Sequence, residues 1–258
     1  GLLANLAALA GHTADVFAEW GAELNHGPTK TAALVELRGR GAKRARVQLH
    51  VHDGQRLACK RQGGGTFALA TAFRYQHLGG IIDVGRGMRP EIKARAADMR
   101  AAERDLRQHI FDRPSLRQKA KDIFAEALAG SRLHHNAQAW LPLGTRAAKD
   151  FRTAAMQLAR SARGLRRGND GNVQDTEVEA TSTGPTAEEQ LSMERLKFLP
   201  RLLRHAPPIL CAMLATDDAE DPTAWKGALA ADYRWMAKQL GWPAPDTAEA
   251  ALAAHWRR

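Results

Sequence analysis

Apolar residues recur every three or four positions at the start of the chain, which is the spacing of one side of an α-helix. The series runs from Leu2 to Leu24, with Gly21 near its end and Asn25, Gly27 and Pro28 directly after it. Over residues 31–38 apolar and polar side chains alternate instead, as they do in a short strand. The predicted order is therefore helix, turn and strand, with Lys30 in the turn.

Alternating patterns continue after this first strand. Val47, Leu49 and Val51 would share one face of a second strand over 47–52. A third strand is expected after the Asp53-Gly54 turn, and 73–84 has the composition of a fourth. The Gly63-Gly64-Gly65 run between them matches no phosphate-loop spacing and is interpreted as a flexible connector.

The pattern changes to helical spacing at Pro90, a residue that the first turn of a helix tolerates. Helices are predicted over 92–110 and 116–128 and then to about Arg167. Residues 168–187 are polar and acidic and read as a linker. A capping-box pattern, Thr186 followed by Glu189, opens a further helical region.

The predicted fold class is thus α+β and predominantly helical. Its predicted parts are a small helix and strand domain, a helical domain, a polar linker and a carboxyl-terminal helical extension, over 1–85, 86–167, 168–187 and 188–258.

Charge narrows the choice of partner. The chain of 258 residues has a formal net charge of +10, and so strong a bias favours a polyanion, with nucleic acid as the leading candidate. Only Cys59 and Cys211 occur, which indicates a reducing compartment and offers no cysteine zinc site. No apolar run approaches the roughly 20 residues of a membrane span, so no membrane partner is expected.

The turn Gly27-Pro28-Thr29-Lys30-Thr31 is not a phosphate-binding P-loop. That loop requires a glycine directly before its lysine, and here Thr29 holds this position. It also follows a strand and opens a helix, so that the helix N-terminus can hold the anion. Here the predicted order is reversed, because a helix precedes the turn and a strand follows it.

Three segments, in order, resemble reverse transcriptases of the non-LTR retrotransposon kind. Residues 17–39 resemble the palm segment called motif D, with Gly21, Asn25, Lys30 and Thr31 matching. Residues 73–83 are similar to the "YKYLG" hairpin beside the primer terminus; Tyr75, Leu78 and Gly79 match, and Gln76 and His77 depart. Residues 131–143 are similar to a "LLYGAETW" stretch of the thumb-like part, with Leu133, Ala137 and Trp140 matching. The resemblance covers residues 1 to about 163.

This resemblance implies a carboxyl-terminal fragment of an RNA-directed DNA polymerase, with the end of the palm and the thumb-like helices. It implies that Lys30 acts in catalysis, by offsetting charge on the departing pyrophosphate or donating a proton to it. It assigns the RNA/DNA template-primer to Tyr75, Gly79, Arg89, Lys93, Arg100, Arg104 and Arg107. It also implies an intracellular, nuclear location.

The family's two metal-binding aspartates, one of them in a "YADD" turn, belong before Gly1. The chain alone is therefore expected to hold no metal or other cofactor and to be inactive, whereas Mg²⁺ is expected in an intact parent. Two alternatives to a polymerase fragment remain. One is a stand-alone basic helical module that binds nucleic acid, and the other is a helical scaffold whose charge serves solvation.

Overall fold

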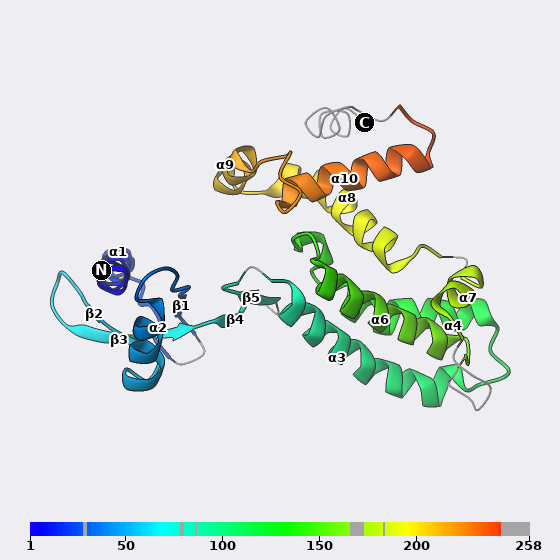
Figure 1. Cartoon of the computed structure of the whole chain (residues 1–258), viewed down its shortest axis with the longest axis horizontal. Helices are drawn as coiled ribbons and strands as arrows, with labels where there is room; N and C mark the ends of the chain where they lie inside the picture. The colour runs from blue at the N-terminus through cyan, green and yellow to red at the C-terminus, as the bar shows by residue number, and fades with distance from the viewer. Residues whose placement is uncertain (28–29, 78–79, 86, 166–172, 183, 244–258) are drawn as a thin grey trace. The chain divides into compact units, whose positions relative to one another are not determined.

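The computed structural model describes residues 1–27, 30–77, 80–85, 87–165, 173–182 and 184–243. The fold is α+β and predominantly helical, as the sequence predicts. The chain divides into two compact units, Gly1–Gly87 and Met88–Arg258. All the described strands lie in the first unit (Figure 1).

The first unit contains a three-stranded sheet and a separate hairpin. Helix α1 spans Leu2–Glu19, and the strands are β1 Ala32–Leu34, β2 Arg56–Lys60, β3 Thr66–Ala72, β4 Arg74–His77 and β5 Gly80–Asp83. The sheet order is β1-β3-β2, with β1 parallel and β2 antiparallel to β3. Strands β4 and β5 pair with each other in antiparallel fashion.

Helix α1 packs closely against β2. A Cβ atom on Gly11 would lie 2.0 Å from the backbone oxygen of Lys60, so only glycine permits this approach. Nearby, the Asp15 carboxylate accepts hydrogen bonds from the Gln62 backbone N–H at 2.7 Å and from Arg61 Nε at 3.1 Å. The helix is thereby held against the loop that joins β2 and β3.

Residues 47–52 are helical, so the prediction of a second strand there is wrong. Helix α2 spans Ala42–Val47 and continues as a π-helical turn over Gln48–His52. The buried positions are Ala42 and Leu49, with Ala45 packed beside them, which is helical spacing. Val47 and Val51 are 44% and 70% exposed, so the apparent alternation does not bury a common face.

Strand β3 was missed by sequence reasoning, and the three glycines beside it form a hairpin turn. The Arg61 N–H donates to the carbonyl of Gly65 at 3.1 Å. Gly64 and Gly65 have φ values of +92° and +91°, which glycine adopts at little cost. The expected single strand at 73–84 is the β4–β5 pair.

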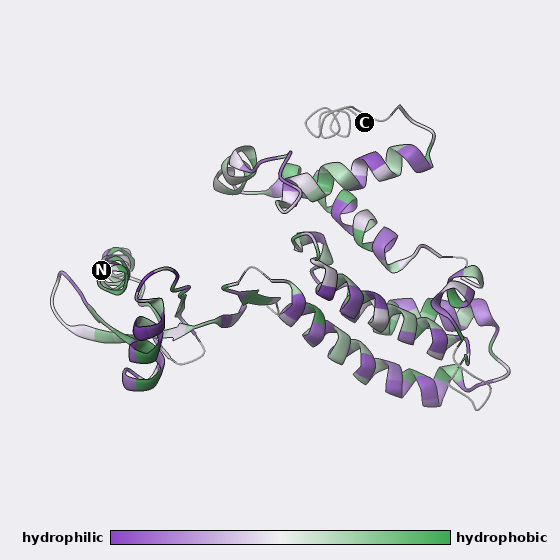
Figure 2. Cartoon of the chain, in the orientation of Figure 1, coloured by the Kyte–Doolittle hydropathy of each residue, from purple (hydrophilic) through white to green (hydrophobic). Residues whose placement is uncertain are grey.

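The second unit is helical, with a core between α3 and α6. Its elements through residue 162 are α3 Arg89–Leu106, a π-helical turn Arg107–Phe111, α4 Gln118–Phe124, a π-helical segment Ala125–Gly130, α5 Ser131–Leu133, a 3₁₀ turn Ala137–Ala139 and α6 Thr145–Ala162. Ile92, Met99 and Phe151 are almost completely buried in this core. Figure 2 shows hydrophilic and hydrophobic residues alternating around the turns of α3 and α6, as expected for helices with one buried side.

The described residues after α6 form four further helices, which are α7 Asp175–Ala180, α8 Ala187–His205, α9 Pro208–Thr216 and α10 Trp225–Gln239. The predicted capping box of α8 is present. Thr186 Oγ1 accepts a hydrogen bond from the Glu189 N–H at 3.2 Å, and the Glu189 carboxylate accepts one from the Thr186 N–H at 2.8 Å. A second core forms between α8 and α10 around Leu199, Leu229 and Tyr233.

The segment 168–187, which is interpreted from the sequence as a polar linker, contains the short helix α7. The side chain of Val178 is completely buried. Asp175 and Glu179 pair with arginines of α6. These tertiary contacts offset the weak helix preference of a polar sequence. Residues 168–172 and 183 of this stretch, and residues 244–258 of the predicted carboxyl-terminal helical extension, lie outside the described residues.

Candidate nucleic-acid interface

Two predicted site residues that lie 45 positions apart meet in the first unit. The Tyr75 hydroxyl on β4 donates a hydrogen bond to the backbone carbonyl of Lys30. The turn before Lys30 is shaped locally: the Asn25 side chain accepts from the Gly27 N–H at 2.9 Å, and the Lys30 N–H donates to the Gly27 carbonyl at 3.0 Å. We call this arrangement the Lys30–Tyr75 corner. The third residue predicted there, Gly79, lies outside the described residues.

Lys30 presents its side chain to solvent. The residue is exposed, and its ammonium forms no ion pair with a carboxylate of the described residues. The turn leads directly into β1, and β4, which follows β3, contacts β1. The Tyr75 side chain on β4 completes the approach with its hydrogen bond to the Lys30 carbonyl.

Beside the corner, the three-stranded sheet has one covered and one open face. Leu57 pairs with Leu69 on the covered face, where Leu69 and Cys59 are buried. On the opposite face Arg56 pairs with Ala70. A hollow of about 640 Å³ lies there, lined by His26, Arg56, Ala70, Arg74, Tyr75 and Gln76 among others. Alanine side chains thus line the base of this hollow, and arginine and glutamine side chains lie at its margin.

The predicted basic residues of α3 share one stripe of that helix. Because successive residues of an α-helix are rotated by about 100°, the five lie within about 60° of arc. They are Arg89, Lys93, Arg100, Arg104 and Arg107, which we call the α3 stripe. The buried residues Ile92, Met99 and Leu106 occupy a neighbouring side. One side of the helix is therefore buried in the core, and the α3 stripe lies on the neighbouring side.

Members of the α3 stripe differ in how much of their charge is already matched. Arg89 Nε lies 2.7 Å from Asp150 Oδ2, and an Arg107 nitrogen lies 2.5 Å from Glu103, whose side chain is buried. Lys93, Arg100 and Arg104 are exposed and form no ion pair with a described carboxylate. These three cations are the ones available to an external anion.

The Arg89–Asp150 pair also sets a local charge state. The hydrogen bond from Arg89 lowers the pKa of Asp150 below its ordinary value, against an opposing effect of partial burial. The charges of Arg89, Lys93 and Lys149 lower this pKa further. Asp150 is therefore ionised at neutral pH and holds Arg89 at the junction of α3 and α6.

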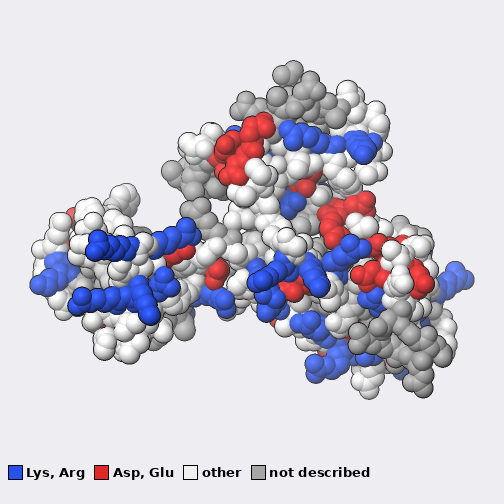
Figure 3. Space-filling view, viewed as in Figure 1, with Lys and Arg blue, Asp and Glu red and all other residues white. Residues whose placement is uncertain are grey.

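A second basic group lies outside the predicted site residues. The segment 38–46 precedes and enters α2, and Arg40, Lys43 and Arg44 are exposed and unpaired among the described residues. Figure 3 shows many Lys and Arg side chains and few acidic ones on the visible surface of residues 1–87, whereas the two signs are interspersed on the second unit. A run of five cations in nine residues was the signal that pointed to this group.

Arg152 and Arg160 of α6, and Arg163 just after the end of that helix, are by contrast paired with acids. An Arg152 nitrogen lies 2.7 Å from Glu179, Arg160 pairs with Asp175, and an Arg163 nitrogen lies 3.6 Å from Asp122. The first two acids belong to α7. Two arginines of α6 are thus paired with acids of α7, whereas Arg146 of the same helix is exposed and has no ion pair with a described carboxylate.

No metal site is evident in the part of the chain that the structure describes. No three His, Cys, Asp or Glu side chains there come together as a metal ion would require. The sequence pair Asp217-Asp218 serves the loop before α10, where Asp217 accepts from the Lys226 N–H at 3.0 Å and Asp218 from the Glu220 N–H at 2.9 Å. We therefore derive no chemical step through a metal ion.

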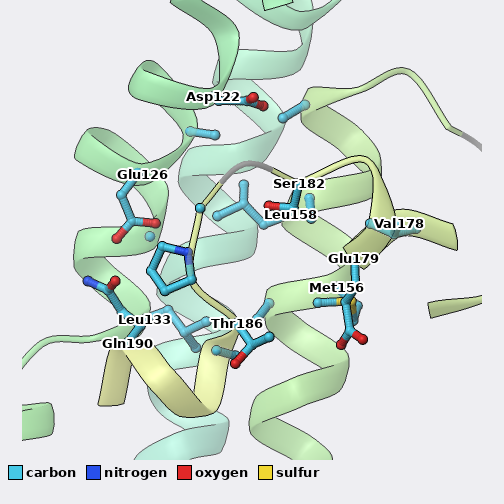
Figure 4. Close-up of a pocket in the computed structure, with 18 of the residues that line it drawn as sticks. Asp122, Glu126, Leu133, Met156, Leu158, Val178, Glu179, Ser182, Thr186 and Gln190 are labelled. Carbon is cyan, nitrogen blue, oxygen red and sulfur yellow. The ribbon is translucent and has the colours of Figure 1, made fainter. Parts of the chain in front are cut away.

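An additional cavity of about 390 Å³ lies in the second unit between α4, α6, α7 and the start of α8 (Figure 4). Leu133, Met156, Leu158 and Val178 line it, with Glu126 and Glu179 at its margin. None of the predicted site residues contributes to it. It is an apolar cavity separate from the α3 stripe.

Comparison of the sequence and structure with protein-family models, curated proteins and solved structures found no match. Among the described helices, none has both the length and the apolar composition needed to cross a bilayer.

Proposed function

We propose that this chain binds the backbone of a template-primer duplex through the α3 stripe, as part of an RNA-directed DNA polymerase. The observation that carries the proposal is that Lys93, Arg100 and Arg104 share one side of α3, are exposed and form no ion pair with a carboxylate of the described residues. Unmatched cations arranged in a row suit the regularly spaced phosphates of a nucleic-acid strand.

The length of the α3 stripe also suits a duplex. At a rise of about 1.5 Å per residue, the stripe from Arg89 to Arg107 extends about 27 Å, which is somewhat less than one turn of a double helix. Arginine and lysine contacts to phosphate fix position but do not read sequence. Binding in this proposal is therefore strong at low salt and indifferent to base sequence.

The Lys30–Tyr75 corner supports the polymerase part of the proposal. The resemblance assigns Lys30 to the incoming triphosphate and Tyr75 to the primer side, and the two residues are in contact. An exposed lysine ammonium is charged at neutral pH and can offset negative charge that develops on a departing pyrophosphate. In this role Lys30 would act on the incoming nucleotide bound by a longer polymerase, and that polymerase would work in the nucleus.

Fluorescence anisotropy with labelled duplexes tests the binding part. Two unrelated sequences, each prepared as DNA duplex and as RNA–DNA hybrid, should bind with affinities within about threefold of one another. Engagement of three to five phosphates predicts that log affinity falls against log salt with a slope between about −3 and −5. An affinity independent of salt would contradict the proposal.

A primer-extension assay separates this proposal from a self-sufficient enzyme. The chain alone should add no nucleotide to a primed template in Mg²⁺, because it offers no assembled metal site among its described residues. Extension by this chain would contradict the account. A stand-alone binding module would show the same duplex binding and the same lack of extension. The two hypotheses are separated by joining a catalytic palm segment upstream of the chain. Substitution of Lys30 should then slow nucleotide incorporation if the chain is a polymerase fragment, and should have no effect if it is a stand-alone module.

A further inference from the structure

Two arginines on α6 and two acids on α7 form a compact group outside the α3 stripe. An Arg152 nitrogen lies 2.7 Å from a Glu179 carboxylate oxygen, and Arg152 Nε lies 4.0 Å from Asp175. Arg160 pairs with the same Asp175 and also donates to the carbonyl of Val173 at 3.1 Å. Asp175 thus stands between two guanidinium groups that lie eight residues apart on α6.

The acids do not fully satisfy this pair of arginines. Arg152 Nε is buried and has no hydrogen-bond acceptor within reach among the described residues, because Asp175 is too distant. A guanidinium presents a fork of N–H donors that two oxygens of one phosphate can engage together. A phosphate would therefore satisfy an Arg152 donor that the α7 carboxylates leave unmatched.

Helix α7 is attached to the rest of the unit by few contacts. Val178 is its one buried residue, and it lines the 390 Å³ cavity together with Glu179 of α7 and Met156 of α6 (Figure 4). Residues 173–182 contain Asp175, Glu177 and Glu179 and no basic residue. Their pairs with Arg152 and Arg160 are partly exposed, and ion pairs of this kind are readily exchanged in water.

We propose that Arg152 and Arg160 form a second phosphate-binding site, which the α7 carboxylates occupy until nucleic acid displaces them. This inference rests on the proposed function. In it, α7 acts as an internal competitor that mimics a short stretch of phosphates. The acid segment lowers affinity for weakly bound polyanions and yields to a polyanion whose phosphates compete successfully with the two α7 carboxylates, because these partly exposed ion pairs are individually weak.

The test compares two variants with equal changes of charge. Asp175→Asn/Glu179→Gln neutralises the acids that pair with Arg152 and Arg160. Glu177→Gln/Glu188→Gln also removes two negative charges, one from α7 and one from α8, but neither acid pairs with an arginine in the described residues. Duplex binding is measured by anisotropy over a range of salt concentrations, with the single variant Asp175→Asn included because it leaves both Glu179 and Val178 in place.

The proposal predicts that Asp175→Asn/Glu179→Gln binds duplex about tenfold more tightly at moderate salt. Its salt slope should be steeper by about 2, because two more phosphates are engaged. Asp175→Asn should show a smaller change in the same direction, and the control double variant should change affinity by less than about threefold with its slope unaltered. Adding Arg152→Gln/Arg160→Gln to the first variant should remove the gain.

Two outcomes would overturn the inference alone. One is an equal gain in both double variants, which would show a general charge effect, and the other is unchanged affinity in Asp175→Asn and in Asp175→Asn/Glu179→Gln. If the wild-type chain bound no duplex at all, the proposed function would fail and this inference with it.

Discussion

Tyr75 donates a hydrogen bond from its hydroxyl to the backbone carbonyl of Lys30, across 45 residues of sequence. The contact ties the turn before β1 to the strand that follows β3. It fixes the backbone at Lys30 while the ammonium of that residue remains exposed. A lysine held in this way can meet an anionic ligand with less loss of conformational freedom than one in an untethered turn.

Tyr75→Phe should loosen this corner without unfolding the unit. The variant removes one hydrogen bond, which is worth about 0.5–1.5 kcal/mol, and keeps the ring. Amide hydrogen exchange should become faster at Lys30 and Thr31. Tyr233→Phe removes a hydroxyl from the other unit and serves as the control, in which exchange at Lys30 should not change. Unaltered exchange at Lys30 in Tyr75→Phe would show that the contact does not hold the turn.

Gly11→Ala should separate α1 from β2. The added methyl group would lie 2.0 Å from the Lys60 carbonyl oxygen, and a backbone atom cannot move aside as a flexible side chain can. The expected cost is about 1–3 kcal/mol of stability, even though alanine is the better helix former. Urea unfolding followed by circular dichroism measures it. The control variant Asn5→Ala, at an exposed position of α1, should change the free energy of unfolding little. A Gly11→Ala variant as stable as the wild type would contradict the close packing of α1 against β2.

Acid should weaken the attachment of α1 to the β2–β3 loop. The Gln62 N–H and then Arg61 hold the pKa of Asp15 below its ordinary value, with partial burial opposing them. Because the folded-state pKa is the lower one, this stabilisation is fully present above the ordinary aspartate pKa and is lost as pH falls through the folded-state value. The protection factor of the Gln62 amide should fall over that acidic range. In the Asp15→Asn variant the protection factor of the Gln62 amide should be low and nearly independent of pH. Equal pH profiles of this protection factor in the variant and the wild type would contradict the prediction.

Arg195→Ala should strongly destabilise the α8–α10 core. Arg195 and Asp232 are both buried and form a two-pronged ion pair, and the Ser192 hydroxyl donates to Asp232 at 2.7 Å. Loss of Arg195 would leave the Asp232 carboxylate buried without its cation, at a cost of about 3–5 kcal/mol in urea unfolding. Arg195→Met/Asp232→Leu should recover much of that loss. A single variant with wild-type stability would show that the pair is not buried in solution.

Helical parts of the fold were predictable because their signals are local. Pro90 and the spacing of Ile92 and Met99 predicted α3, and the Thr186 and Glu189 pattern predicted the start of α8. The sheet was harder. Strand β3 carries alanines at 68, 70 and 72, which have weak strand preference, and its position depends on pairing with β1 and β2.

The candidate site shows the same division. The spacing of Arg100 and Arg104 was enough to place them on one side of a helix. The Arg107–Glu103 pair is four residues apart and could have been recognised in the sequence. The Arg89–Asp150 pair joins residues 61 positions apart and depends on how α3 packs against α6. Helix α7 was missed for the same reason, because its partners Arg152 and Arg160 lie on another helix.

The salt dependence of duplex binding by Arg100→Gln/Arg104→Gln tests the central claim most directly. The two arginines are exposed and unpaired among the described residues, so their loss should leave the fold and its thermal unfolding unchanged. Arg201→Gln/Arg204→Gln on α8 removes the same charge from exposed positions outside the α3 stripe. If the stripe binds phosphates, the first variant should bind duplex at least about tenfold more weakly at low salt, with a slope shallower by about 2, and the second should keep the wild-type slope. Equal losses of affinity and slope in the two variants would contradict the claim, because they would show that net charge and not the α3 stripe governs binding.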